Sequence, residues 1–157
     1  TKAPVVCRIL LVEDDPPVPE RLASIIRDWT GGELVADCAT LAAATEAIRT
    51  HSINLLITDL RLPDGHGVQA IRFLRSTQPG AEAMVISALA DDQTVIEAIE
   101  AGATGYLLKD SDPINVIDAI SELLEGGSPI SSAIARTIVR RLGGRPSADS
   151  LKEDSGQ

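Results

Sequence analysis

The chain has 157 residues, enough for one domain with a real core plus an extension, and 44% of them are hydrophobic, which excludes a disordered chain. Only 2% are aromatic, so Val, Ile, Leu and Ala must fill the core, and the formal net charge of −9 argues against direct nucleic-acid binding. No apolar stretch is as long as a membrane span, no basic-then-apolar leader is present, and two cysteines are too few for a disulfide framework, so we expect a cytoplasmic protein.

Apolar runs and helical periodicities alternate along the chain as far as Gly127. The runs are typical of strands buried on both faces of a parallel sheet, and they are predicted at residues 5–12, 34–39, 53–59, 84–87 and 106–108. A segment with apolar residues three or four positions apart follows each run, as expected for a helix with one buried face. Thr40, Asp91 and the pair Asp112-Pro113 are the predicted starts of three of these helices. Five strand–helix units predict an α/β fold, a doubly wound five-stranded parallel sheet with right-handed crossovers.

The pattern changes after Gly127. Ser128-Pro129 is a break, and residues 131–142 are predicted to form one more helix with Ile134, Ile138 and Leu142 on one face. Arg136, Arg140 and Arg141 in this helix and Arg145 just beyond it make the region locally basic, and a solvated helix face explains them better than a DNA contact does. Residues 144–157 are polar and rich in Gly and Ser, so we expect a disordered tail.

Polar side chains follow four of the predicted strands. Glu13 and Asp14 come after the first strand, Asp59 ends the third, Ser87 ends the fourth and Lys109 follows the fifth. In a parallel sheet these ends lie on the same edge. Carboxylates about 4 Å apart repel by about 4 kcal/mol at an effective dielectric constant of about 20, and a bound Mg²⁺ would remove that repulsion. A carboxylate, Mg²⁺, a lysine and a hydroxyl together suit a phosphoryl group, which the carboxylate could accept as a nucleophile.

Four segments resemble the receiver domain of bacterial two-component response regulators, and they stand in the order and spacing of that family: residues 9–15, 56–67, 85–88 and 102–109. The resemblance covers about residues 5–126 and implies a flavodoxin-like sheet with strand order 2-1-3-4-5. Residues 126–135 resemble the linker of the LuxR-type subfamily, in which a helix-turn-helix DNA-binding domain follows. No such domain is in this sequence. The expected organisation is therefore a receiver domain (1–126), a linker with one helix (127–143) and the tail (144–157).

The resemblance implies a metal site around the phosphoryl acceptor. Asp59 would accept the phosphoryl group from a sensor histidine kinase. Asp14 and Asp59 would bind Mg²⁺ together with the backbone carbonyl of Arg61, and Glu13 would act through a metal-bound water. Arg61 and Leu89 occupy two positions that tune access of the hydrolytic water in this family, so the sequence leaves the lifetime of the phosphoryl group open.

The resemblance also implies a switch. Ser87 would hydrogen-bond one phosphoryl oxygen, Lys109 would pair with another, and Tyr106 would turn inward when Ser87 moves. The expected function is a phosphorylation-dependent signal that controls a transcriptional output domain, with no enzymatic activity beyond the chain's own phosphorylation and dephosphorylation. The expected partner is the sensor histidine kinase, with a homodimer on phosphorylation left open, and neither membrane nor DNA is expected to contact this chain directly.

Three other functions share part of this sequence pattern. An aspartyl-phosphate phosphatase shares a nucleophilic Asp at a strand end but requires a second Asp two residues later, where this chain has Arg61. A flavin-binding module requires a phosphate-cradling loop after the first strand, where this chain has three acidic residues. The strongest rival is a receiver-like module that acts through protein contacts without phosphorylation.

Overall fold

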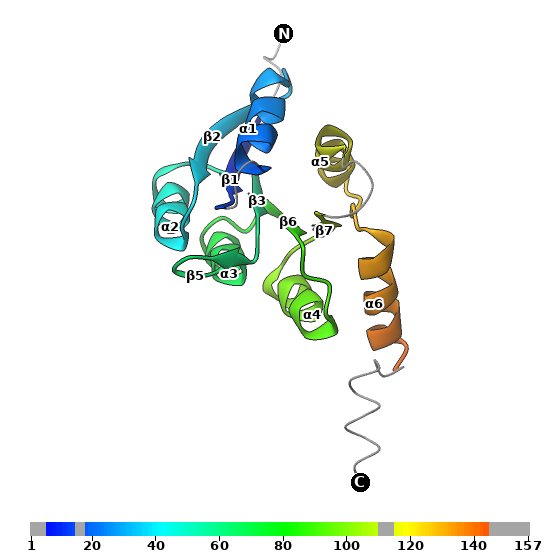
Figure 1. Ribbon diagram of the computed structural model, residues 1–157. Coiled ribbons are helices and arrows are strands. Elements are labelled where there is room, and N and C mark those ends of the chain that lie inside the picture. Colours follow the sequence, from blue (N-terminus) through cyan, green and yellow to red (C-terminus); the bar gives the residue numbers. More distant parts are fainter. Residues whose placement is uncertain (1–5, 15–17, 110–114, 145–157) are drawn as a thin grey trace.

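A five-stranded parallel sheet forms the centre of the molecule (Figure 1). The structure is a computed structural model, and it describes residues 6–14, 18–109 and 115–144. The strand order is β2-β1-β3-β6-β7, which confirms the predicted order 2-1-3-4-5 once a small hairpin is set aside. The sheet strands are β1 (Cys7–Val12), β2 (Gly32–Cys38), β3 (Leu55–Thr58), β6 (Glu82–Ser87) and β7 (Gly105–Leu108). The hairpin pairs β4 (Arg61–Leu62) with β5 (Gly65–His66) directly after β3.

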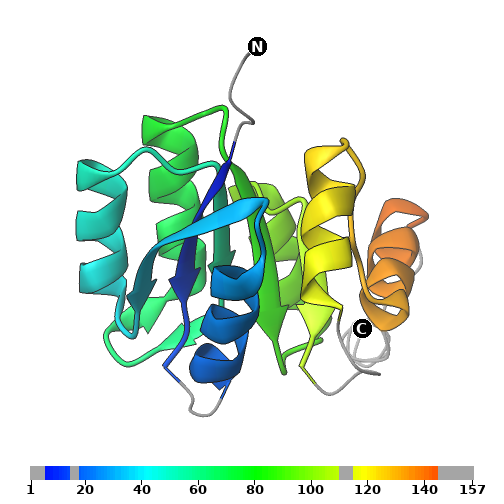
Figure 2. The same ribbon diagram turned by 90° about the horizontal axis from the view of Figure 1, so that it is seen from above.

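Helices cover both faces of the sheet (Figure 2). They are α1 (Val18–Asp28), α2 (Leu41–Thr50), α3 (Gly67–Thr77), α4 (Asp92–Ala101), α5 (Val116–Leu124) and α6 (Ser132–Leu142). Alternate residues of a strand point to opposite faces, so Leu10 of β1 packs in one core with α2, α3 and α4, whereas Ile9 and Leu11 pack in a second core with α1 and α5. None of the described helices is long and apolar enough to cross a membrane.

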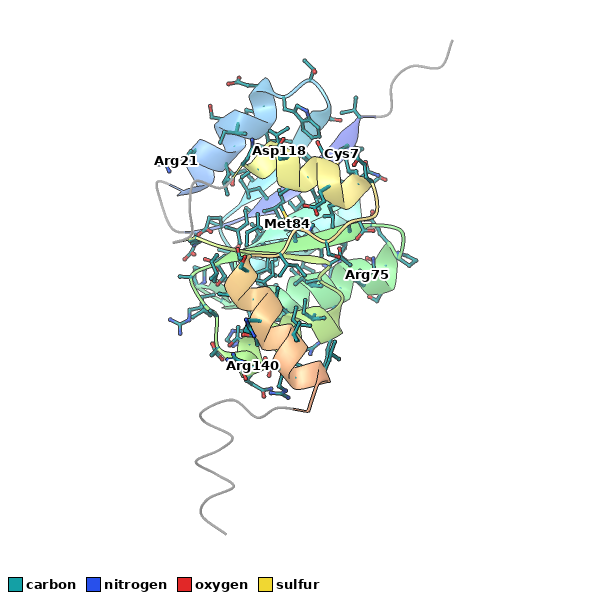
Figure 3. All side chains as sticks on the ribbon, turned by 90° about the vertical axis from the view of Figure 1, so that its right-hand side faces the viewer. Cys7, Arg21, Arg75, Met84, Asp118 and Arg140 are labelled. Atoms are coloured by element: carbon teal, nitrogen blue, oxygen red, sulfur yellow. The ribbon has the colours of Figure 1, made fainter. Side chains whose placement is uncertain are left out.

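Helix α6 lies beside α4 and β7, at the edge of the sheet (Figure 3). Ile134 is fully buried and Ile138 packs against the same core, as the sequence predicted. Leu142, predicted on the same face of the helix, is 85% exposed and takes no part in this packing. Nη2 of Arg140 lies 3.6 Å from Oδ1 of Asp92 in α4. One of the arginines that we expected to be solvated therefore forms an ion pair.

Local capping sets the helix boundaries. The hydroxyl of Thr40 accepts the N–H of Ala43, as expected for the start of α2. Helix α5 begins at Val116, and Asn115 is its cap, with its side chain accepting the N–H of Asp118. The predicted cap at Asp112-Pro113 lies outside the described residues.

Candidate functional site

The pairing of neighbouring strands brings the predicted polar residues to one edge. Val12 of β1 pairs with Thr58 of β3, so Glu13 and Asp59, the residues that follow them, are neighbours. The N–H of Asp59 donates to the carbonyl of Val12 at 2.9 Å. On the other side of β3, the N–H of Lys109 donates to the carbonyl of Ser87, also at 2.9 Å. The ends of four parallel strands therefore converge, as the α/β architecture requires.

Lys109 joins two of the carboxylates. Its Nζ lies 2.7 Å from Oδ2 of Asp59 and 2.9 Å from Oε2 of Glu13. All three side chains are largely buried, at 13%, 10% and 2% exposed respectively. Burial alone would lower the pKa of Lys109, but the hydrogen bonds and charges of Asp59 and Glu13 outweigh it, so the pKa lies above its usual value. The two carboxylates therefore favour the charged form of the lysine.

Three carboxylates form a group that could hold a cation. Glu13, Asp14 and Asp59 each offer an oxygen, and these oxygens all lie within 4.8 Å of one another. An all-oxygen donor set with waters completing the shell suits Mg²⁺. Asp59 is oriented further by the N–H of Leu60, which donates to its Oδ1 at 2.7 Å.

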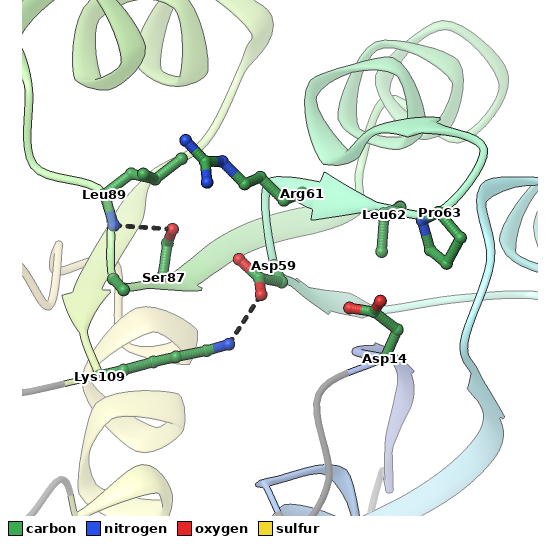
Figure 4. Close-up of a pocket in the computed structure, with 9 residues that line it drawn as sticks. Asp14, Asp59, Arg61, Leu62, Pro63, Ser87, Leu89 and Lys109 are labelled. Atoms are coloured by element: carbon green, nitrogen blue, oxygen red, sulfur yellow. Dashed lines mark hydrogen bonds and ion pairs between the residues drawn. The ribbon is translucent and has the colours of Figure 1, made fainter.

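A cleft of about 440 Å³ opens over these groups (Figure 4). It is lined by Asp14, Asp59, Arg61, Leu62, Pro63, Ser87, Ala88, Leu89 and Lys109. The side chain of Arg61 extends across the mouth of the cleft toward Leu89. Its positive charge contributes to the lowered pKa of Asp91, although the larger cause is the hydrogen bond from the Thr94 side chain.

Tyr106 lies beneath the cleft and is linked to Ser87 through Leu89. The hydroxyl of Tyr106 donates to the carbonyl of Leu89 at 2.5 Å, and the N–H of Leu89 donates to Oγ of Ser87 at 3.1 Å. Tyr106 is fully buried, and this burial raises its pKa to about 12, with a smaller opposing effect from a hydrogen bond with Ser87. The predicted switch pair is thus in contact, with Tyr106 in the inward position.

Two features of the loop after Asp59 were missed by sequence reasoning. A Cβ on Gly67 would lie 2.0 Å from the carbonyl oxygen of Asp59, so only glycine lets α3 begin against the acceptor. Asp64 crosses to α2, where its two oxygens accept the N–H groups of Leu41 and Ala42 at 2.7 and 2.9 Å. These hydrogen bonds lower the pKa of Asp64. No residue spacing in the sequence indicates that Asp64 caps a helix so far away along the chain.

The structure places every predicted site residue around this cleft. Glu13, Asp14, Asp59, Ser87 and Lys109 converge as the sequence predicted, but their roles in binding and transfer stay predictions. The contribution that sequence reasoning missed is the backbone of Leu89, which connects Ser87 to Tyr106. Hydrogen bonds made by backbone groups cannot be predicted from the types of the residues that make them.

Comparison with known proteins gives a consistent result. The family profile of the response regulator receiver domain matches residues 9–121. The glycerol metabolism activator of Pseudomonas putida is 32% identical over 131 residues, which cover 83% of this chain and 59% of that protein. The chemotaxis protein CheY of Bacillus subtilis is 31% identical over 117 residues, which cover 74% of this chain and 97% of that protein.

Solved structures agree with these matches. The crystal structure of a LuxR-family two-component response regulator from Aurantimonas sp. SI85-9A1 superposes with a TM-score of 0.78 at 31% identity, covering 87% of this chain and 98% of that one. The receiver domain of the regulator NarL from Mycobacterium tuberculosis gives a TM-score of 0.71 at 28% identity, covering 78% and 99%. The chain spans less than two thirds of the length of the curated transcriptional regulators that it matches, such as the DevR/DosR activator of Mycobacterium tuberculosis at 63%.

Proposed function

The chain belongs to the response regulator receiver domain family, and we propose that it is a phosphorylation-dependent signalling switch whose acceptor is Asp59. Members of this family are signalling proteins rather than classical enzymes. The observation that supports the acceptor is the convergence of Asp59 with two further carboxylates on one side and with Lys109 and Ser87 on the other, within one cleft.

The donor set of the cleft fits Mg²⁺. Asp14 and Asp59 would hold the ion together with the backbone carbonyl of Arg61, and Glu13 would act through a water. When bound, Mg²⁺ supplies positive charge to the oxygens of the phosphoryl group. Lys109, which bridges Asp59 and Glu13 in this structure, would exchange one of these partners for a phosphoryl oxygen.

Asp59 would be the nucleophile in the transfer of the phosphoryl group. A carboxylate oxygen attacks the phosphorus of a phosphohistidine in the sensor kinase, an O–P bond forms and the P–N bond breaks. The electron pair of that bond returns to the imidazole nitrogen of the kinase, and Asp59 becomes an aspartyl phosphate. The hydroxyl of Ser87 donates to one of the new oxygens.

The conformational response would run through Ser87 and Tyr106. A phosphoryl group adds about −1.5 to −2 charges and strong acceptor oxygens. A shift from mostly inactive to mostly active needs about 5.5 kcal/mol of differential interaction, and contacts of Mg²⁺, Lys109 and Ser87 with the phosphoryl group are the proposed sources. Leu89 would transmit the motion of Ser87, because its backbone bonds to both switch residues.

The regulatory setting is part of the proposal. The relatives named as transcriptional regulators are longer than this chain, and control of a transcriptional output domain is part of our proposal. Within the chain we assign residues 1–126 to the receiver, 127–143 to a linker and 144–157 to a tail. A sensor histidine kinase in the cytoplasm would be the partner, and phosphorylation could act through a homodimer. This chain itself would contact neither DNA nor membrane.

A labelling experiment tests the acceptor. Acetyl phosphate with Mg²⁺ should add one base-labile phosphoryl group, measured by intact mass, and EDTA should prevent it. Asp59→Asn removes the nucleophile and should abolish labelling, whereas Asp64→Asn is a matched control in the exposed turn and should be labelled normally. Equal stoichiometry in Asp59→Asn would refute the site.

The rival function is a receiver-like interaction module that needs no phosphorylation. It is favoured by one observation: Lys109 forms ion pairs with two of the three carboxylates, Glu13 and Asp59. Titration with Mg²⁺ and beryllofluoride, a phosphoryl analogue, separates the two. Shifts in the amide spectrum around Ser87 and Tyr106 support the switch, and an unchanged spectrum supports the module.

A further inference from the structure

The outer edge of β7 is occupied by the chain itself. β7 is the last strand of the sheet, so its outer N–H and C=O groups would otherwise face solvent. The N–H of Tyr106 donates to the carbonyl of Pro129 at 2.9 Å, and the N–H of Ser131 donates to the carbonyl of Tyr106 at 3.0 Å. The linker turn, residues 129–131, therefore forms a short parallel pairing with the strand that bears the switch tyrosine.

Ser131 uses its hydroxyl in an unexpected direction. It is the N-cap of α6, where a serine side chain usually accepts an N–H of its own helix. Here it makes no such bond, and its Oγ instead accepts the N–H of Leu108 at 3.0 Å. Leu108 immediately precedes Lys109, so Ser131 fixes the backbone just before the site lysine.

A glycine in β7 lets the linker turn approach the strand closely. A Cβ on Gly105 would lie 3.1 Å from the ring and 3.2 Å from the carbonyl oxygen of Pro129, so the glycine admits the turn. Helix α6 holds the turn in place, because Ile134 is fully buried against the core. Ile138 packs against the same core, and Arg140 forms an ion pair with Asp92 of α4.

The two edges of β7 therefore form hydrogen bonds with different segments of the chain. One edge bonds to the linker turn, and the other carries Lys109 beside Ser87. Tyr106 links the linker turn to the site. Its backbone pairs with the turn, and its hydroxyl donates to the carbonyl of Leu89. In this arrangement the Oγ of Ser87 accepts the N–H of Leu89.

We propose that Ser131 is a positioning residue of the phosphoryl site, and that docking of the linker turn with α6 is coupled to occupancy of that site. The inference rests on the proposed function. The docked turn stabilises the arrangement in which Tyr106, Leu89 and Lys109 are ready for a phosphoryl group. By thermodynamic reciprocity, a ligand in the phosphoryl site tightens the docking of α6 by the same factor.

Beryllofluoride binding in saturating Mg²⁺ tests the coupling on the full chain. Ser131→Ala should raise the dissociation constant about threefold to tenfold, the range expected for the loss of one hydrogen bond. Ser131→Thr keeps a hydroxyl and should restore binding to within about twofold. Mg²⁺ affinity without beryllofluoride should not change, because the three carboxylates lie on other strands. Ser132→Ala, at the exposed neighbouring position, is the matched control and should bind like the wild type.

A second measurement uses the wild type alone. Saturating beryllofluoride should slow hydrogen exchange of the α6 amides, and unchanged exchange there would overturn the coupling. Equal dissociation constants for wild type and Ser131→Ala, even with a lower Tm in the variant, would show that the turn is merely structural. A wild type that does not bind beryllofluoride at all would instead refute the proposed function, and the coupling with it.

Discussion

At the scale of single residues, Lys109 determines the electrostatic balance of the site. It lies between two carboxylates that are almost fully buried, and it has only 13% of its side chain exposed. A buried carboxylate without a partner is strongly unfavourable, whereas an exposed ion pair contributes little. The effect of removing this one cation should therefore exceed that of removing a surface cation.

Lys109→Met keeps an unbranched side chain that is one atom shorter and removes its charge. We expect the free energy of unfolding in EDTA to fall by about 3 kcal/mol, as when one partner of a buried ion pair is removed. Mg²⁺ should recover part of the loss and bind more tightly than to the wild type, because the competing ammonium is gone. Denaturant titrations with and without Mg²⁺ measure both effects.

Arg49→Met is the control for this variant. Arg49 is 61% exposed and lies 3.5 Å from Glu46, so its loss should cost less than about 1 kcal/mol and should not respond to Mg²⁺. Similar losses in the two variants would contradict the importance assigned to Lys109.

Tyr106 provides a spectroscopic test of its own burial. It is the single tyrosine of the chain, so tyrosinate absorbance reports this residue alone. Burial raises its pKa from 10.0 to about 12, and the folded protein should therefore show almost no tyrosinate at pH 10.5. The unfolded protein should already be largely ionised there.

The same shift predicts how stability depends on pH. Above pH 10 the unfolded chain loses the phenol proton before the folded one does, so the free energy of unfolding should fall from about pH 10 to 12. The raised pKa of Lys109 acts in the same direction, because its contribution is complete below its unfolded pKa and is lost as the pH rises through the folded one. A stability that is flat over this range would contradict both assignments.

At the scale of elements, the start of α3 fixes the loop that carries Asp59. The N–H of Gly67 donates to the carbonyl of Leu60 at 2.9 Å, and its Cα approaches the backbone of Asp59 so closely that a Cβ would be 2.0 Å from the carbonyl oxygen. The clash is with backbone, which cannot rotate away as a side chain could.

Gly67→Ala should therefore lower the free energy of unfolding by about 3 kcal/mol, at the upper end of the cost of overpacking. Gly80→Ala is a matched control, because nothing lies within 4 Å of its Cβ and its φ is not positive. That variant should be neutral or slightly stabilising. Thermal unfolding of the two variants decides the point, and equal Tm values would show that the loop adjusts freely.

Elements differ in how far the sequence specifies them. The strand Leu55–Thr58 is completely apolar up to its last residue, so both its burial and the position of Asp59 at its end follow from the residue pattern. The start of α5 does not, because Asp112 and Asn115 are both good caps by residue type, and the structure shows Asn115 capping the helix at Val116. The site carboxylates could likewise be predicted from strand ends, but the bonds of Leu89 and of the turn at Pro129 involve backbone atoms that no residue pattern encodes.

At the scale of the whole molecule, α6 is an addition to a complete sheet. The five strands and the helices α1 to α5 form the two cores, and α6 joins one of them mainly through Ile134. Leu142, predicted on the same face, lies two turns further along the helix and is 85% exposed. The sequence showed which face of α6 is apolar, but not how much of that face has a surface to pack against.

This arrangement predicts that α6 can detach while the sheet stays folded. Ile134→Ala removes the buried anchor, a change that costs about 2–5 kcal/mol where the cavity does not collapse. The loss should appear as faster hydrogen exchange of the α6 amides, with exchange in β1 and β3 unchanged, because local opening exposes only the elements that the anchor holds. Leu142→Ala, at an 85% exposed position of the same helix, should leave α6 as protected as in the wild type. If Ile134→Ala instead accelerates exchange uniformly across the sheet, α6 belongs to the global folding unit and its attachment is not separable from the fold.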